Sequence, residues 1–121
     1  MKRDLDLVRD ILLAVEHGGT SGLEVDALTL VDRDPELIAR HVQLLHEAGY
    51  LIAIYTEPDQ GGIILHGVER MTWKGHEFLD AARNDTVWHK VTASVRAKAA
   101  SVPFEVLTPL LIEATKKWLS S

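Results

Sequence analysis

Apolar residues recur at spacings of three and four over residues 37–48, which places them on one face of a helix. The positions concerned are Leu37, Ile38, Val42, Leu44, Leu45 and Ala48. Asp34 and Pro35 suit the start of this helix, and Gly49 suits a left-handed residue directly after its end. The pattern therefore predicts a helix between Asp34 and Gly49.

The pattern changes from helical to extended directly after Gly49. Residues 50–56 (YLIAIYT) are rich in β-branched and aromatic side chains, residues 57–62 (EPDQGG) are typical of a turn, and residues 63–68 (IILHGV) fit a returning strand. Thr72 then suits the N-cap of a further helix with Phe78, Leu79 and Ala82 on its apolar side. The order helix, hairpin, helix is typical of a winged helix-turn-helix and indicates a binding module rather than an enzyme.

Helical patterns also flank this block. One helix is predicted over residues 2–17, another begins at Asp85 or Thr86 and runs to about residue 100, and a last one follows Pro103. Residues 22–31 (GLEVDALTLV) fit either a short helix or an extended strand that pairs with the hairpin. We favour a short helix around residues 25–30, because a helix-turn-helix needs a supporting helix there.

These elements predict one domain that is mainly α with a small β-hairpin. Its winged helix-turn-helix core covers residues 1–85 and a C-terminal helical extension covers residues 86–121. The sequence has no cysteine, which excludes disulfides and thiolate metal sites and fits a reducing cytoplasm. No segment approaches the roughly 20 apolar residues of a membrane span. We therefore expect a cytoplasmic protein without a membrane partner.

The last predicted helix has more apolar surface than one buried face needs. One stripe carries Phe104, Leu107, Leu111, Ala114 and Trp118, and the apolar surface continues over Leu110, Ile112 and Leu119. Such a helix either threads through the core or pairs with another copy. The second option predicts a homodimer with Leu110, Leu111 and Trp118 at its interface. We expect Trp73 and Trp88 in the core, whereas Trp118 fits either the core or a contact patch.

Duplex DNA is the first partner that this fold suggests. The helix after Asp34 occupies the place of a recognition helix, and its polar side carries Arg40 and Gln43, which suit base edges in the major groove. Arg33, just before the helix, suits a phosphate. These three residues are the candidate nucleic-acid contacts.

The charge distribution opposes DNA binding and opens an alternative. Residues 1–85 contain eight Lys or Arg and 16 Asp or Glu, and acidic residues crowd both the helix start and the hairpin turn. Residues 86–121 contain five basic and two acidic residues, the basic ones being Lys90, Arg96, Lys98, Lys116 and Lys117. An acidic helix and hairpin also suit docking to a basic protein partner, steered by complementary charge.

Catalytic motifs are weak, and we expect neither an enzyme nor a bound cofactor or metal. His76 and Asp80 have the i, i+4 spacing of a truncated zinc-protease motif, but the second histidine of that motif is absent. His89 could supply a third ligand only if the next helix folded back at the right angle. The simpler interpretation is that these residues lie on helix surfaces.

Three segments of the chain resemble a known family. These are residues 1–16 (MKRDLDLVRDILLAVE), 71–91 (MTWKGHEFLDAARNDTVWHKV) and 102–107 (VPFEVL). They are similar to an uncharacterised family of small bacterial proteins that is common in prophages. This family is known only as a domain of unknown function. The resemblance implies a winged-helix-like fold and a phage or mobile-element setting, without implying an activity or site residues.

Overall fold

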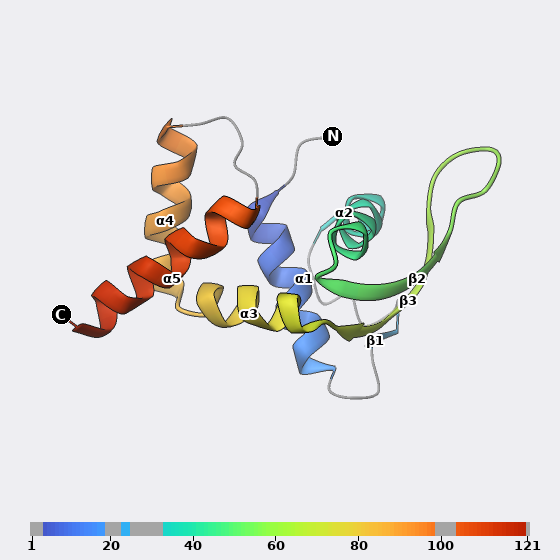
Figure 1. Ribbon diagram of the computed structural model, residues 1–121. Helices are drawn as coiled ribbons and strands as arrows, with labels where there is room; N and C mark the ends of the chain where they lie inside the picture. The colour runs from blue at the N-terminus through green and yellow to red at the C-terminus, as the bar shows by residue number, and fades with distance from the viewer. Residues whose placement is uncertain (1–3, 19–22, 25–32, 99–103, 121) are drawn as a thin grey trace. The chain divides into compact units, whose positions relative to one another are not determined.

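The structure is a computed structural model that describes residues 4–18, 23–24, 33–98 and 104–120. Within these ranges the chain forms five helices and a three-stranded antiparallel sheet (Figure 1). The helices are α1 (Leu5–His17), α2 (Pro35–Glu47), α3 (Trp73–Ala82), α4 (Asp85–Lys98) and α5 (Phe104–Ser120), and the strands are β1 (Leu23–Glu24), β2 (Leu51–Thr56) and β3 (Ile64–Met71). The α+β class expected from the sequence is confirmed.

The chain divides into two compact units, Met1–His76 and Glu77–Ser121. The division falls inside α3, whereas the sequence analysis placed the start of the C-terminal extension after residue 85. Every helix in the described ranges is too short or too polar to cross a bilayer.

In the first unit, α1 and α2 pack against each other, and both contact the sheet. The Asp4 side chain caps α1 by accepting a hydrogen bond from the Leu7 N–H at 3.1 Å. The Asp34 side chain caps α2 by accepting from the Glu36 N–H at 3.2 Å. The buried side chains of the two helices are mostly aliphatic: Leu7, Val8, Ile11, Leu12, Val15, Ile38, Ala39, Val42 and Leu45.

The predicted helix between Asp34 and Gly49 is confirmed as α2. Gly49 has a φ of +86°, the left-handed conformation expected of a glycine that ends a helix. One detail differs, because Ala48, which was assigned to the apolar face, is exposed at the end of the helix.

The predicted hairpin is confirmed as β2 and β3, with β3 extending three residues further, to Met71. The register pairs Leu51 with Met71 and Thr56 with Ile64, and it shifts twice in between. The sheet order is β1-β3-β2, so the two residues of β1 pair with β3 as the extended alternative anticipated. The short helix favoured around residues 25–30 lies outside the described residues.

The two ends of the hairpin are fastened together where α3 begins. The Thr72 N–H donates to the Tyr50 carbonyl at 3.0 Å, and the Thr72 hydroxyl donates to the Gly49 carbonyl. The same hydroxyl accepts from the Gly75 N–H at 3.2 Å, which confirms Thr72 as the N-cap of α3. A Cβ atom at Gly75 would lie 2.0 Å from the Tyr50 carbonyl oxygen, so only glycine fits this close approach.

The expected burial of Trp73 is wrong, because this side chain is 78% exposed. Trp73 opens α3, and the buried Phe78 lies five positions later, which corresponds to about 140° around a helix. Periodicity therefore places Trp73 on the side of α3 opposite Phe78.

In the second unit, α4 and α5 pack against each other. Trp88 is fully buried, as expected, and its ring meets that of Phe78 edge-on at 6.2 Å between centroids. The cap of α4 is Asn84, whose side chain accepts from the Val87 N–H at 3.0 Å, and not Asp85 or Thr86 as expected. Both of those residues lie within the helix, Asp85 one position and Thr86 two positions after the cap.

Candidate interaction surface

One side of α2 faces away from the core and carries polar residues. Glu36, Arg40, Gln43 and Glu47 follow one another at spacings of four, three and four, so they form a single stripe, here called the α2 polar stripe. Glu36 and Glu47 are exposed, and Arg40 and Gln43 are half-buried. Arg40 forms no ion pair with another residue of the described ranges.

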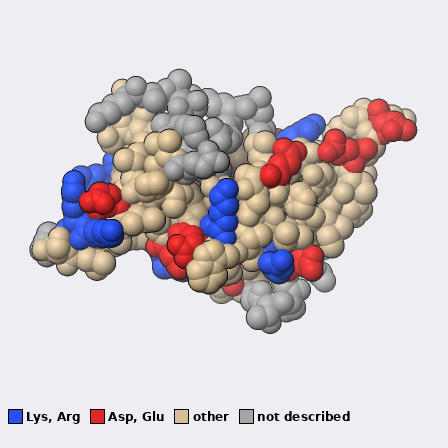
Figure 2. All heavy atoms as spheres, viewed as in Figure 1, with Lys and Arg blue, Asp and Glu red and all other residues tan. Residues whose placement is uncertain are grey.

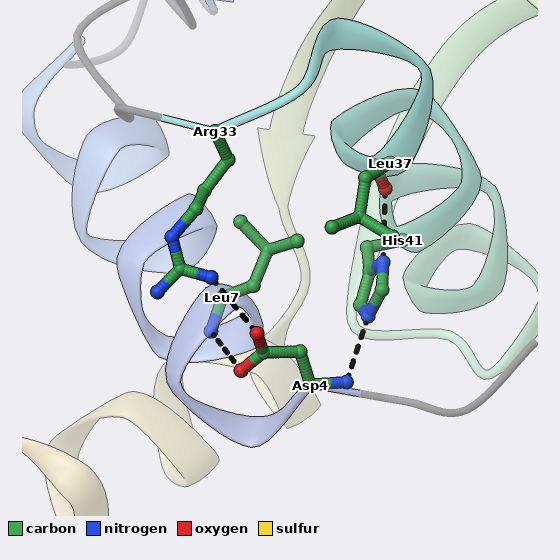
Figure 3. A network of polar contacts seen from close by, with 5 residues as sticks. All are labelled: Asp4, Leu7, Arg33, Leu37 and His41. Carbon is green, nitrogen blue, oxygen red and sulfur yellow. Dashed lines mark hydrogen bonds and ion pairs between the residues drawn. The ribbon is translucent and has the colours of Figure 1, made fainter.

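Arg33, the expected phosphate contact, is paired within the chain. Its Nη1 lies 2.8 Å from Oδ2 of Asp4, while Oδ1 of Asp4 accepts the Leu7 N–H (Figure 3). Burial acts to raise the pKa of Asp4, but the hydrogen bonds from Leu7 and Arg33 and the positive charge of Arg33 outweigh it and lower the pKa. Arg33 thus joins the approach to α2 with the start of α1.

His41 completes this network from inside α2. Its ring is fully buried, and its Nε2 accepts the Asp4 backbone N–H at 2.9 Å (Figure 3). The other nitrogen, Nδ1, lies 2.9 Å from the Leu37 carbonyl, which can only accept. The two partners therefore fix the neutral ring with its proton on Nδ1. This role was not predicted from the sequence, although His41 falls between Ile38 and Leu45 on the buried face.

Gln43, one of the expected base contacts, is also held within the chain. Its Nε2 donates to Oε1 of Glu57 at 2.7 Å, from α2 to the start of the hairpin turn. Because a carboxylate only accepts, this contact also fixes the orientation of the amide. In this conformation, the Gln43 donor and the Arg33 charge are both engaged by carboxylates. Of the three expected DNA contacts, Arg40 alone has no ion pair or side-chain hydrogen bond among the described residues.

The surface formed by the α2 polar stripe and the hairpin turn is acidic. Over residues 36–60 it carries four carboxylates, on Glu36, Glu47, Glu57 and Asp59, against the single guanidinium of Arg40. Figure 2 shows acidic side chains along the hairpin. This charge repels phosphates and favours a basic partner surface.

The comparisons with known proteins identify the family of this chain. A family model described as a hypothetical protein (DUF2513) matches residues 2–101. The chain belongs to this family. It is also similar to a protein of Haemophilus influenzae that carries the name "Uncharacterized protein", with 34% identity over 110 residues, which cover 88% of this chain and 89% of that protein. No solved structure matches the chain.

The family match covers the α2 polar stripe, the hairpin and the Asp4 network, and it ends before α5. The part of the chain beyond the match therefore includes all three residues expected at a dimer interface, Leu110, Leu111 and Trp118.

The second unit contains a groove of about 580 Å³ between α4 and α5. Its lining is Thr86, Val87, Lys90, Val91, Ser94 and Val95 of α4 with Leu110, Glu113, Ala114, Lys117 and Trp118 of α5. Of the residues expected at a dimer interface, Leu110 and Trp118 are 45% and 48% exposed. Leu111 is a correction: it is fully buried, because it lies about 100° around the helix from Leu110.

The histidine and acidic residues considered for a metal are not assembled in the described part of the chain. No group of three or more potential ligands occurs there. Asp80, which was considered with His76, instead accepts a hydrogen bond from Arg83 at 2.7 Å through its Oδ1. His76 and His89 are exposed on helix surfaces.

Proposed function

We propose that this protein is a winged-helix protein-interaction module that docks a basic surface of a partner protein through the α2 polar stripe and the hairpin turn. The order α1, α2 and hairpin supports the winged-helix assignment. The phage or mobile-element setting implied by the resemblance suits a partner in the host, such as a protein with a basic nucleic-acid-binding surface.

The Gln43–Glu57 hydrogen bond is the observation that carries this proposal. A recognition helix needs polar side chains that are available to base edges, and this bond engages one of the two candidates with a carboxylate. The bond also holds Glu57 beside the stripe, so the hairpin adds negative charge to the surface of α2. A fixed set of carboxylates attracts a basic partner and discriminates against nucleic acid.

Sequence-specific DNA binding is the competing proposal, and Arg40 supports it. This side chain lies in the middle of the stripe without an ion-pair partner in the described ranges, so its guanidinium is available to a guanine. The two proposals differ in what Arg40 and its acidic neighbours do, and the same variants therefore test both.

The first experiment measures anisotropy of a labelled random duplex at about 50 mM and about 200 mM salt. We expect no binding by the wild-type protein at either salt concentration, because carboxylates dominate the surface. Salt-dependent binding that Arg40→Glu removes would overturn the protein-interaction proposal in favour of DNA.

The second experiment passes a bacterial lysate freed of nucleic acid over immobilised protein. We expect basic proteins to be retained by the wild type, released by salt, and lost with the double variant Glu36→Lys/Glu47→Lys. Glu77→Lys is the matched control, since Glu77 is an exposed carboxylate outside the stripe, and it should retain them. Equal loss in the control would show only a dependence on overall charge and would contradict docking through the stripe.

A further inference from the structure

The hairpin has an outer face that carries exposed apolar side chains. The inner face is occupied: the Ala53 N–H donates to His46 Nδ1 at 3.1 Å, and Tyr55 meets the His46 ring edge-on at 5.4 Å. Ile54 lies between these two residues and points to the opposite face, where it is 56% exposed. Ile64, paired with Thr56 on that same face, is 50% exposed.

The end of the hairpin is negatively charged. Asp59 is exposed in the turn, and residues 56–63 contain no lysine or arginine. The hairpin thus combines two accessible isoleucines with an acidic end, and Figure 1 shows it projecting away from α2.

The groove between α4 and α5 has the complementary chemistry. Its walls are mainly apolar, with five aliphatic side chains and the Trp118 ring, and the charged side chains that line it are Lys90, Lys117 and Glu113. Leu110 and Trp118 remain about half exposed, so the groove is open along its wall rather than enclosed. Small ligands are usually bound in pockets that bury most of their surface. An open apolar groove rimmed by two lysines fits a protruding, acidic and apolar chain segment better.

We propose that the hairpin of one copy of this chain docks in the α4–α5 groove of a second copy, with Ile54 and Ile64 on the apolar wall and Asp59 beside Lys90 and Lys117. Charge favours this pairing over contact between two grooves. Residues 86–121 have a net charge of +3, so groove-to-groove contact would bring like charges together, whereas residues 1–85 have a net charge of −8.

This inference goes beyond the proposed function. Both proposals use the acidic hairpin turn with Asp59, but each also depends on residues that the other does not use. Docking of a basic partner depends on Glu36 and Glu47, which self-association does not use. Self-association depends on Ile54, Ile64 and Lys117, which lie outside the α2 polar stripe. Either proposal can therefore fail while the other holds.

Sedimentation equilibrium over a range of protein concentrations tests the inference. The weight-average mass of the wild type should rise above the 13.5 kDa of one chain. Ile54→Ser/Ile64→Ser and Lys117→Glu should each weaken association by about tenfold or more. Lys116→Glu is the matched control, because this neighbouring exposed lysine does not line the groove, and it should associate more than tenfold better than Lys117→Glu. All substituted side chains are exposed, so circular dichroism should show an unchanged fold.

Mixing the two weakened variants distinguishes docking of a hairpin in a groove from a symmetric pairing of two α5 helices. The hairpin variant keeps an intact groove and the groove variant keeps an intact hairpin, so an equimolar mixture should regain association through one native junction. A wild-type protein that stays monomeric throughout would overturn the inference. So would a hairpin variant that associates like the wild type, or a mixture that stays as weak as its components.

Discussion

The junction of α1 with α2 and the packing of α4 with α5 are both helix pairs, but they differ in the side chains at their edges: the first joins polar groups, and the second leaves apolar side chains exposed. At the first junction, the polar atoms of Asp4, Arg33 and His41 find partners within the chain. At the second, Leu110 and Trp118 remain half exposed beside two lysines. A polar group that is satisfied internally stabilises the fold, whereas an apolar group that stays exposed has contacts still to make.

The largest expected effect comes from the core of the second unit. Trp88→Ala should lower the free energy of unfolding by about 3–5 kcal/mol, because it empties a fully buried site against Phe78. Trp73→Ala is the matched control and should change it by less than about 0.5 kcal/mol, because Trp73 is exposed. Urea denaturation measures both values. Similar losses in the two variants would contradict the burial of only one of these tryptophans.

The next effect tests the start of α3 in the first unit. Gly75→Ala should destabilise the protein by about 1–3 kcal/mol or more, because the new methyl group would overlap the Tyr50 carbonyl and the Met71 side chain. Thermal unfolding measures the shift. Glu77→Ala at an exposed position of the same helix is the control, and a Gly75→Ala protein as stable as this control would disprove the close approach.

His41→Leu tests whether the polar junction stabilises the first unit. The substitution keeps an apolar side chain in the buried site but leaves the Asp4 N–H without its acceptor, at an expected cost of about 1–3 kcal/mol. Amide hydrogen exchange of Asp4 should accelerate at the same time. Exchange and unfolding that match the wild type would show that the histidine does not serve as this acceptor.

The smallest effect concerns acid stability. The lowered pKa of Asp4 means that its carboxylate stabilises the fold fully above its ordinary pKa of 3.8, and that this contribution is lost as the pH falls through the lower folded value. Asp4→Asn should therefore flatten the decline in stability below about pH 4, by no more than about 1 kcal/mol because the pair is partly exposed.

Asp10 contributes to acid stability with the opposite sign. Burial raises its pKa, so the fold gains stability as Asp10 takes up a proton. The Asp4 contribution is therefore measured as the difference between the wild-type and Asp4→Asn denaturation profiles. Parallel profiles would show that the Asp4 carboxylate has no differential interaction in the folded state.

The sequence predicts those parts of the fold that local chemistry determines. Asp34, Pro35 and Gly49 mark the ends of α2, and the strand residues flanking a turn with two glycines mark the hairpin. Gly61 and Gly62 have φ values of +93° and +84°, which glycine adopts readily. Errors of one or two positions, such as the choice of Asp85 or Thr86 over Asn84 as a cap, arise because neighbouring residues have similar capping ability.

The candidate site is harder to predict from the sequence because its contacts join residues that are far apart along the chain. Asp4 and His41 are 37 positions apart, Asp4 and Arg33 are 29 apart, and Gln43 and Glu57 are 14 apart. Arginine and glutamine on the polar side of a helix indicate DNA contacts only if their side chains are not already bound to other residues of the chain. Tertiary structure decides that availability, and here it changes the most favoured partner.

The fastening of Gly49 and Tyr50 to Thr72 has a consequence for how this chain can vary. Because the hairpin leaves and returns to the same point, its length and tip do not determine how α2 is followed by α3. The turn between the strands, residues 57–63, can therefore vary in length, and insertions there would alter the reach of the hairpin while the buried strand residues Leu51, Val68 and Met71 keep their packing. A turn of different length or sequence would present a different surface to a partner.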